Sequence, residues 1–216
     1  MAKTQEIGTE EFDVEKTIKA FEAVPKDGSR PAVCLTKEYI AAIKEMCNFF
    51  NICGSGFGFV TSDVSQKLIL LEKHRTERDL PNGIDNLQGM MQWEEDNDMF
   101  DKDVKYNGAR TLLRLNRASQ FVMLLIKYIM EREKASMSSN AYDAYSETLM
   151  RFHSWMIKKA VGVAVYAIPS RHTLLKNMKM TEDEARESLP RLVVAIDTVF
   201  SALDKHYTEH KLQKLP

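Results

Sequence analysis

The sequence predicts an all-α protein, and three observations lead to this fold class. Apolar residues recur at the 3.6-residue spacing of amphipathic helices over long segments, whereas strict apolar–polar alternation is scarce and runs of β-branched residues are short. A chain of 216 residues is also long enough to bury one sizeable core. We therefore predict a single compact helical domain. Within it, residues 1–35 form an N-terminal helix and linker, and residues 36–216 form the functional domain.

Turn-forming residues divide the chain into about eight predicted helices. Clusters of Pro, Gly, Ser and Asn punctuate the helical pattern, and they are typical of turns. The predicted helices span about residues 10–24, 36–51, 57–77, 84–101, 108–132, 140–161, 162–177 and 181–208. Thr36 and Thr181 are expected to be N-cap residues. Pro169 and Pro190 fall inside helical patterns, so they are expected to kink or to begin helices.

The charge and cysteine content exclude several classes of protein. The net charge is −1 and the charges are spread along the chain, which argues against a general nucleic-acid binder. Cys34, Cys47 and Cys53 are odd in number and lack a CxxC or metal-ligand spacing, so reduced thiols in a cytosolic protein are expected. No apolar run reaches 18 residues, so any membrane contact is expected to be peripheral. Neither a metal nor a cofactor is predicted.

Two pairs of charged residues fall on the apolar sides of predicted helices. On a helical wheel, Asp63 and Lys67 lie among the apolar residues of the segment that begins at Phe57. Arg110 and Arg114 share an arc with apolar residues on a later helix. An internal salt-bridge network is one interpretation, but three cations then face one acid. A bound anionic amphiphile is the other, because a phosphate balances the excess charge while an apolar body enters the interior.

Arg117 and His153 are two further residues whose positions bear on a binding site. Arg117 lies at the border of the same helical arc as Arg114. His153 falls on the apolar border of the predicted helix 140–161, where a histidine is more often a satisfied core residue than a ligand. Its pattern alone therefore indicates no function.

Three segments of the chain resemble the glycolipid transfer protein family. They are SDVSQK (Ser62 to Lys67), ARTLLRLNRA (Ala109 to Ala118) and FHSWMIKKAVGVAVYAIPSR (Phe152 to Arg171), and the order and spacing match from about Glu38 to the C-terminus. The resemblance implies a two-layer helical sandwich that encloses an apolar cavity for lipid chains. It also implies a non-catalytic protein that moves a sphingolipid between membranes.

The resemblance implies a role for each charged residue. Asp63 is expected to accept a hydrogen bond from the ceramide amide N–H, and His153 to donate one to the acyl carbonyl. Lys67, Arg110 and Arg114 are expected to hold a phosphate. Members that carry glycolipids have tryptophan at the position of Arg114 and asparagine at that of Lys67. Both differences favour ceramide 1-phosphate as the ligand, because an arginine removes the stacking surface for a sugar and adds a bidentate partner for phosphate.

The cavity and its membrane contact are expected to involve apolar and interfacial residues. Trp155 beside Lys158 and Lys159 is a candidate docking patch for transient contact with membrane surfaces. The residues expected near the cavity are Phe49, Phe50, Ile52, Phe57, Phe59, Val60, Leu113, Phe121, Val122, Leu125, Phe152, Val161, Val165 and Ile168.

Other functions remain open at this point. The same cations could bind another phosphate-headed lipid or retain a glycosphingolipid. A lipid sensor that signals through a protein partner is compatible with the same residues. A lipid-metabolising enzyme is not favoured, because no nucleophile–base pair or metal set has a recognisable spacing. A monomer is expected.

Overall fold

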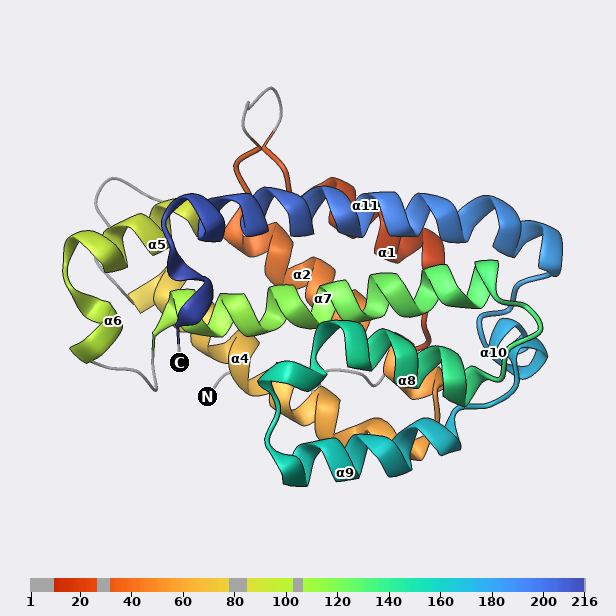
Figure 1. The fold of residues 1–216 in the computed structure, drawn as a ribbon. Helices are drawn as coiled ribbons and strands as arrows, with labels where there is room; N and C mark the ends of the chain where they lie inside the picture. Colours follow the sequence, from red (N-terminus) through yellow and green to blue (C-terminus); the bar gives the residue numbers. More distant parts are fainter. Residues whose placement is uncertain (1–9, 27–31, 78–84, 103–106, 216) are drawn as a thin grey trace.

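The computed structural model describes residues 10–26, 32–77, 85–102 and 107–215 (Figure 1). In these ranges the chain is helical, and the only β-type pairings are isolated bridges between Pro25 and Cys34 and between Leu35 and Asn86. The all-α prediction is therefore confirmed.

The described residues form α-helices and several 3-10 segments. The α-helices are α1 (Val14–Glu22), α2 (Thr36–Cys47), α3 (Phe49–Ile52), α4 (Gly58–Glu77), α5 (Leu87–Asp96), α6 (Met99–Lys102), α7 (Gly108–Glu131), α8 (Met137–Thr148), α9 (Trp155–Ala164), α10 (Arg171–Asn177) and α11 (Glu182–Glu209). The 3-10 segments are η1 (Ser55–Phe57), η2 (Met150–Phe152), η3 (Val165–Ala167) and η4 (Leu212–Lys214).

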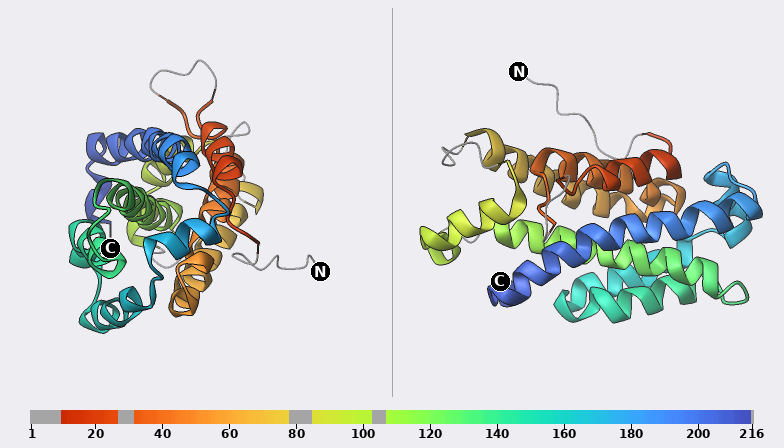
Figure 2. Two further views of the ribbon diagram at one scale, coloured as in Figure 1. Left: turned by 90° about the vertical axis from the view of Figure 1, so that its right-hand side faces the viewer. Right: turned by 90° about the horizontal axis from the view of Figure 1, so that it is seen from above.

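The long helices form two layers. In the end-on view of Figure 2, α1, α2 and α4 lie on one side, and α7, α8 and α11 lie on the other. Contacts between α1 and α11 join the layers at one edge, and contacts between α4 and α7 join them at the other edge. The apolar faces of both layers therefore meet in one core, as the two-layer sandwich requires.

Helix α7 occupies the centre of this arrangement. It contacts α4, α5, α8 and α11, and it runs through the middle of the molecule in Figure 1. Its buried side chains repeat at helical spacing; examples are Leu115, Val122 and Ile129. A helix that is apolar on more than one side must be covered by several partners. The neighbours of α7 supply that cover.

Several helices begin at side-chain caps. Thr181 forms a capping box with Glu184 at the start of α11, as its predicted N-cap role requires. Thr36 does not cap α2: Leu35 holds the N-cap position without a side-chain hydrogen bond, and Thr36 is the first helical residue. The N-cap prediction for Thr36 was therefore wrong by one position.

The predicted helix 140–161 is wrong, because the chain turns in its middle. Helix α8 ends at Thr148, η2 follows, and His153 adopts an extended conformation with φ −98° and ψ 143°. The Ser154 side chain then accepts a hydrogen bond from the Ile157 N–H and begins α9. An N-cap serine inside an apolar pattern thus divides the segment into two helices with different directions.

Two other predicted helices are interrupted by local backbone preferences. The segment 162–177 breaks at Ile168, which is extended (φ −66°, ψ 127°) because the residue before Pro169 avoids the α region. The segment 84–101 breaks between α5 and α6, where Asp98 is left-handed with φ 52°. Pro190, in contrast, lies inside α11 without ending it.

The cysteines are free, and the described helices are too short or too polar to span a membrane. Cys34, Cys47 and Cys53 are free thiols and are buried. Burial raises the pKa of the Cys34 thiol to about 11, although the Gln88 side chain opposes this change. Among the described helices, none combines the length and the apolarity needed to cross a bilayer.

The turn at Gly54 provides a stability test. Its φ is +113°, and a Cβ atom there would lie 2.9 Å from the backbone oxygen of Ala167. Gly54→Ala is therefore expected to lower the free energy of unfolding by about 1–3 kcal/mol, measured by urea denaturation.

The matched control for this substitution is Gly162→Ala. A Cβ atom at helical Gly162 would point into open space, with no atom within 4 Å beyond the local backbone, and alanine is a better helix former than glycine. This control is expected to keep or to increase stability. Equal stabilities for the two variants would contradict the strain assigned to Gly54.

Candidate functional site

A cavity of about 550 Å³ opens between α4, α7, α8 and α9. Its wall is mostly apolar, and its rim holds an acid, three basic residues and a histidine. The lining residues are Phe50, Phe57, Phe59, Val60, Asp63, Val64, Lys67, Arg114, Leu115, Arg117, Ala118, Phe121, Tyr145, Leu149, Phe152, His153, Ile157, Ala160, Val161 and Leu215. An apolar interior with a few polar groups at one end suits an amphiphilic ligand.

The cavity confirms part of the expected lining. Phe50, Phe57, Phe59, Val60, Phe121, Phe152 and Val161 were expected and line it. Phe49, Val122 and Leu125 are buried in the core instead. A helical wheel separates an apolar side from a polar side. It does not separate the part of that side which meets a cavity from the part which meets another helix.

Asp63 and Lys67 form an ion pair on the rim of the cavity. Both belong to α4, one turn apart, and both line the cavity. The Asp63 side chain is 65% exposed and that of Lys67 is 16% exposed. The expectation that these charges face the core was therefore wrong for Asp63: it lies beside apolar lining residues but is open to solvent.

The start of α7 is fixed by two side chains. The Asn107 side chain caps the helix by accepting from the Arg110 N–H at 2.7 Å. Glu94, fully buried on α5, accepts from the N–H groups of Gly108 and Ala109 at 2.8 Å each. The first N–H groups of a helix lack internal partners, and a carboxylate stabilises that end. These contacts fix the position of the turn that includes Arg110.

Arg110 and Arg114 lie on successive turns of α7. Arg114 is exposed, lines the cavity, and makes no ion pair with a carboxylate in the ranges that the structure describes. Arg110 is half-buried and is not among the lining residues. Burial and the charge of Arg114 lower the pKa of Arg110. Arg110 and Arg114 are thus close enough for their charges to interact, and Arg114 of the two lines the cavity.

Arg117 has a larger part in the cavity than its sequence pattern indicated. It lines the cavity, its guanidinium lies 3.6 Å from the centre of the Phe152 ring, and its Nη2 donates to the Gln213 carbonyl at 2.7 Å. Arg151 lies over the same ring at 4.7 Å. Burial, followed by the charge of Arg151, lowers the pKa of Arg117. Positive charge therefore accumulates on this rim.

The contributions of Arg151 and of the C-terminal segment were missed in the sequence. Arg151 lies in the 3-10 segment η2, on a different element from Arg117, so no helical wheel relates the two residues. Leu215 reaches the cavity because Lys211, with φ 58°, reverses the chain after α11 and Leu212 is buried. The sequence did contain a signal for Arg117: in LLRLNR it lies three residues after Arg114, so both side chains fall on neighbouring parts of one helix surface.

His153 lines the cavity from the turn between η2 and α9. Its Nδ1 lies 3.0 Å from the hydroxyl oxygen of Tyr145 on α8. Burial lowers the pKa of His153, the charge of Asp63 opposes this, and Lys67 and Arg114 lower it further. These charges act on one ring, so residues from α4, α7 and the α8–α9 connection meet at this end of the cavity. The earlier placement of His153 on a helix was wrong.

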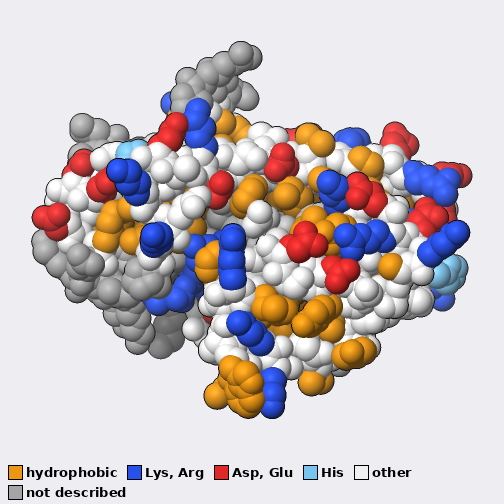
Figure 3. All heavy atoms as spheres, viewed as in Figure 1, with side chains coloured by type: hydrophobic (Ala, Val, Ile, Leu, Met, Phe, Trp, Pro, Cys, Tyr) orange, Lys and Arg blue, Asp and Glu red, His pale blue; other side chains and the backbone are white. Residues whose placement is uncertain are grey.

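Helix α9 presents apolar side chains to solvent. Trp155, Met156, Val163 and Tyr166 are 68%, 74%, 75% and 81% exposed, and Tyr166 lies just beyond the helix in η3. The Lys159 ammonium lies 4.0 Å from the Trp155 ring centre. Figure 3 shows hydrophobic and basic side chains together at the lower edge of the molecule, where Figure 1 places α9. Exposed apolar patches of this kind mark interaction surfaces.

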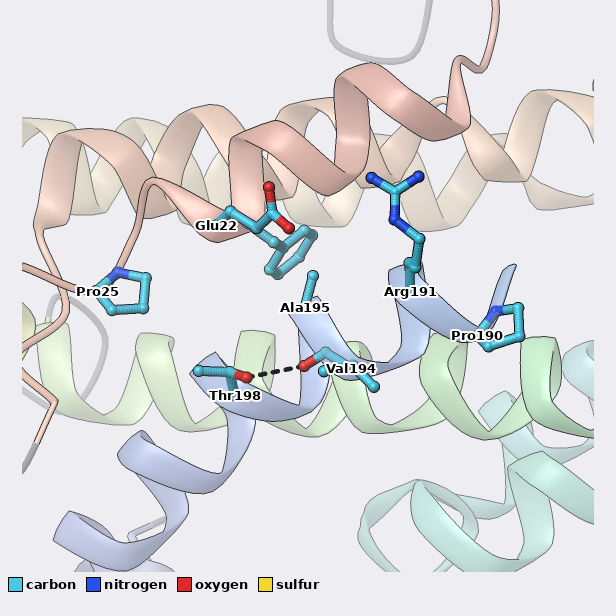
Figure 4. Close-up of a pocket in the computed structure, with 8 residues that line it drawn as sticks. Glu22, Pro25, Pro190, Arg191, Val194, Ala195 and Thr198 are labelled. Carbon is cyan, nitrogen blue, oxygen red and sulfur yellow. Dashed lines mark hydrogen bonds between the residues drawn. The ribbon is translucent and has the colours of Figure 1, made fainter. Parts of the chain in front are cut away.

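A second hollow lies on the opposite part of the molecule, between α1 and α11. It has a volume of about 430 Å³ and is lined by Phe21, Glu22, Pro25, Pro190, Arg191, Val194, Ala195 and Thr198 (Figure 4). Thr198 donates to the Val194 carbonyl, and Arg191 pairs with Glu15. The charged residues that line this hollow are Glu22 and Arg191, one of each sign, so it lacks the excess of cations found at the main cavity.

A family profile and individual relatives match the sequence of this chain over most of its length. The family profile of "Glycolipid transfer protein (GLTP)" matches residues 34–180. A ceramide-1-phosphate transfer protein from Rattus norvegicus is 34% identical over 190 residues, which is 84% of this chain and 88% of that protein. The corresponding protein from Homo sapiens is 31% identical over 188 residues, which is 84% of this chain and 87% of that protein.

Solved structures have the same fold. The mouse ceramide-1-phosphate transfer protein in its apo form superimposes with a TM-score of 0.86 at 32% identity, over 95% of this chain and 100% of that chain. The human protein in complex with 12:0 ceramide-1-phosphate also gives 0.86, at 28% identity over 95% of this chain and 100% of that chain. With this fold, and with a profile match over most of its length, the chain belongs to the glycolipid transfer protein family.

Proposed function

We propose that this protein moves ceramide 1-phosphate between membranes without covalent chemistry. The observation that supports this most directly is the cavity itself, which joins an apolar interior to a rim with an excess of cations. Several relatives that cover most of the chain are ceramide-1-phosphate transfer proteins, and one such protein was solved with the phosphorylated lipid bound. Family membership supports lipid transfer rather than catalysis.

The phosphate is held by Lys67, Arg110 and Arg114 in this proposal. Lys67 and Arg114 line the cavity, and Arg110 lies one helical turn from Arg114. Removing several cations from bulk water costs free energy unless an anion compensates them. A phosphomonoester supplies up to two negative charges and accepts paired hydrogen bonds from arginine. A neutral sugar supplies no charge, so the phosphate lipid is favoured.

The ceramide amide is bound by Asp63 and His153 in this proposal. The Asp63 carboxylate only accepts hydrogen bonds, so it suits the amide N–H. A ring nitrogen of His153 that bears hydrogen suits the acyl carbonyl. The ion pair with Lys67 keeps Asp63 on the rim near His153. Burial lowers the pKa of His153, and the nearby Asp63 charge only partly opposes this effect.

The lipid chains enter the apolar cavity, and α9 makes the transient contact with the bilayer. Exposing a lipid chain to water costs about 0.8 kcal/mol per CH₂. Extraction therefore requires a cavity wall that is as apolar as the bilayer interior which the chain leaves. Trp155 suits the membrane interface, and Lys158 and Lys159 attract anionic lipid. This arrangement is consistent with a cytosolic monomer that touches membranes only during exchange.

Arg114→Ala tests the phosphate site. The substitution is expected to slow transfer of fluorescent ceramide 1-phosphate between vesicles about 10- to 100-fold, because it removes a charged hydrogen-bond donor from the headgroup. Galactosylceramide is the comparison lipid, and the wild type is expected to move it much more slowly than ceramide 1-phosphate.

Arg186→Ala is the control for this experiment. Arg186 is an exposed arginine on α11 that does not line the cavity, and its loss should leave transfer unchanged. Preferential transfer of the galactolipid by the wild type would contradict the proposed headgroup. Tight binding of ceramide 1-phosphate without transfer would indicate a lipid sensor instead.

Trp155→Ala tests the docking patch. The exposed ring makes few contacts within the protein, so its loss should leave the unfolding temperature unchanged while transfer from anionic vesicles slows several-fold. Val194→Ala on α11, also exposed and apolar, is the matched control. Equal transfer rates for both variants would remove Trp155 from the docking surface.

A further inference from the structure

Tyr145 lies against His153 and has no part in the function proposed above. Its side chain is 2% exposed, and it lines the same cavity. The hydroxyl oxygen is 3.0 Å from Nδ1 of His153, and the two ring centres are 5.6 Å apart at an angle of 38°. This contact joins a residue of α8 to the residue that precedes the N-cap of α9.

The backbone of His153 does not fix the direction of its ring. The residue is extended between η2 and α9, and its N–H donates to the Met150 carbonyl at 3.2 Å. No neighbouring helical turn therefore restricts the side chain as it would inside a helix. The hydrogen bond between the Tyr145 hydroxyl and Nδ1 supplies the missing restraint, and it leaves Nε2 as the ring nitrogen available to a ligand.

The direction of this hydrogen bond follows from the chemistry of the two groups. Burial raises the pKa of Tyr145 and lowers that of His153, so both are neutral near pH 7. A phenol is a stronger donor than a neutral imidazole N–H, and an unprotonated imidazole nitrogen is a good acceptor. The phenol hydrogen therefore points to Nδ1, and the ring hydrogen is on Nε2.

The charged groups around the ring agree with a neutral imidazole. Asp63 is the acid that favours protonation, whereas Lys67, Arg114 and Lys158 oppose it. These groups come from α4, α7 and α9, and Tyr145 completes the surroundings from α8. With more cations than acids nearby, a positive charge on His153 is disfavoured.

We propose that Tyr145 is a positioning residue: by donating its hydroxyl hydrogen to Nδ1 of His153, it holds Nε2–H ready to donate to the acyl carbonyl of the lipid. The inference rests on the proposed function for the identity of the ligand. Asp63 as acceptor and Nε2–H as donor together recognise a secondary amide. The pair therefore selects N-acylated sphingoid phosphates over phosphorylated lipids without an amide.

The first test is ¹⁵N NMR of the lipid-free protein with labelled histidine. In the wild type, Nδ1 of His153 should have the chemical shift of an unprotonated, hydrogen-bonded nitrogen, and Nε2 that of a protonated one. In Tyr145→Phe, the Nδ1 shift should move and the pKa of His153 should rise, because the neutral ring loses its donor. A protonated Nδ1 in the wild type, or an unchanged pKa in the variant, would overturn the proposal.

The second test compares two ligands that share the phosphate. Tyr145→Phe is expected to weaken binding of ceramide 1-phosphate about three- to tenfold, the effect of one hydrogen bond. Binding of sphingosine 1-phosphate, which has no acyl carbonyl, should change less than twofold. Equal losses for both ligands would indicate a purely structural role and would also overturn the proposal.

Tyr142→Phe is the matched control. Tyr142 lies one turn before Tyr145 on α8, is 46% exposed and does not line the cavity, so its substitution should change neither the His153 resonances nor lipid binding. The two hypotheses fail separately. If the wild type binds no ceramide 1-phosphate, the proposed function fails while the NMR result still decides the role of Tyr145.

Discussion

The arrangement of the site depends on the buried carboxylate of Glu94 at the start of α7. Its two oxygens accept the N–H groups of Gly108 and Ala109, and Asn107 caps the next group. A buried helix end without partners would be costly, and this one begins a helix that packs against α4, α5, α8 and α11. Because the start of α7 is fixed, the turns that present Arg110 and Arg114 are fixed relative to α4 and α5.

The rest of the site combines an apolar interior with charges at its rim. The apolar wall comes from both layers, whereas the cations that line the cavity come from α4 and α7. Asp63 with Lys67, and Arg117 with the Gln213 carbonyl, have partners inside the protein. Arg114 remains open to the cavity. The lipid-free protein thus limits the cost of clustered cations while it leaves a guanidinium accessible to an anion.

The region around His153 is built differently from the helices. There, the fold places an extended residue between two helices, so side-chain hydrogen bonds rather than helical geometry determine which atoms face the cavity. Helix α9 continues from this point and exposes Trp155 and Met156. Ligand recognition and the exposed apolar surface are therefore adjacent in the chain, so the residues proposed to bind the amide lie next to those proposed to meet the membrane.

The sequence by itself determined the helical class, the positions of α4, α7 and α11, and the unusual charges Asp63, Lys67, Arg110 and Arg114, because these depend on periodicity within one helix. The tertiary structure decided the rest. Ser154 and Pro169 divide predicted helices, because a local N-cap and the backbone restriction before proline outweigh an apolar pattern. Asp63 is at a rim and not in a core, Tyr145 and Leu215 reach the cavity from separate elements, and Arg151 lies over the ring of Phe152, which lines it. Such contacts join residues that are distant in sequence, and no pattern within one helix specifies them.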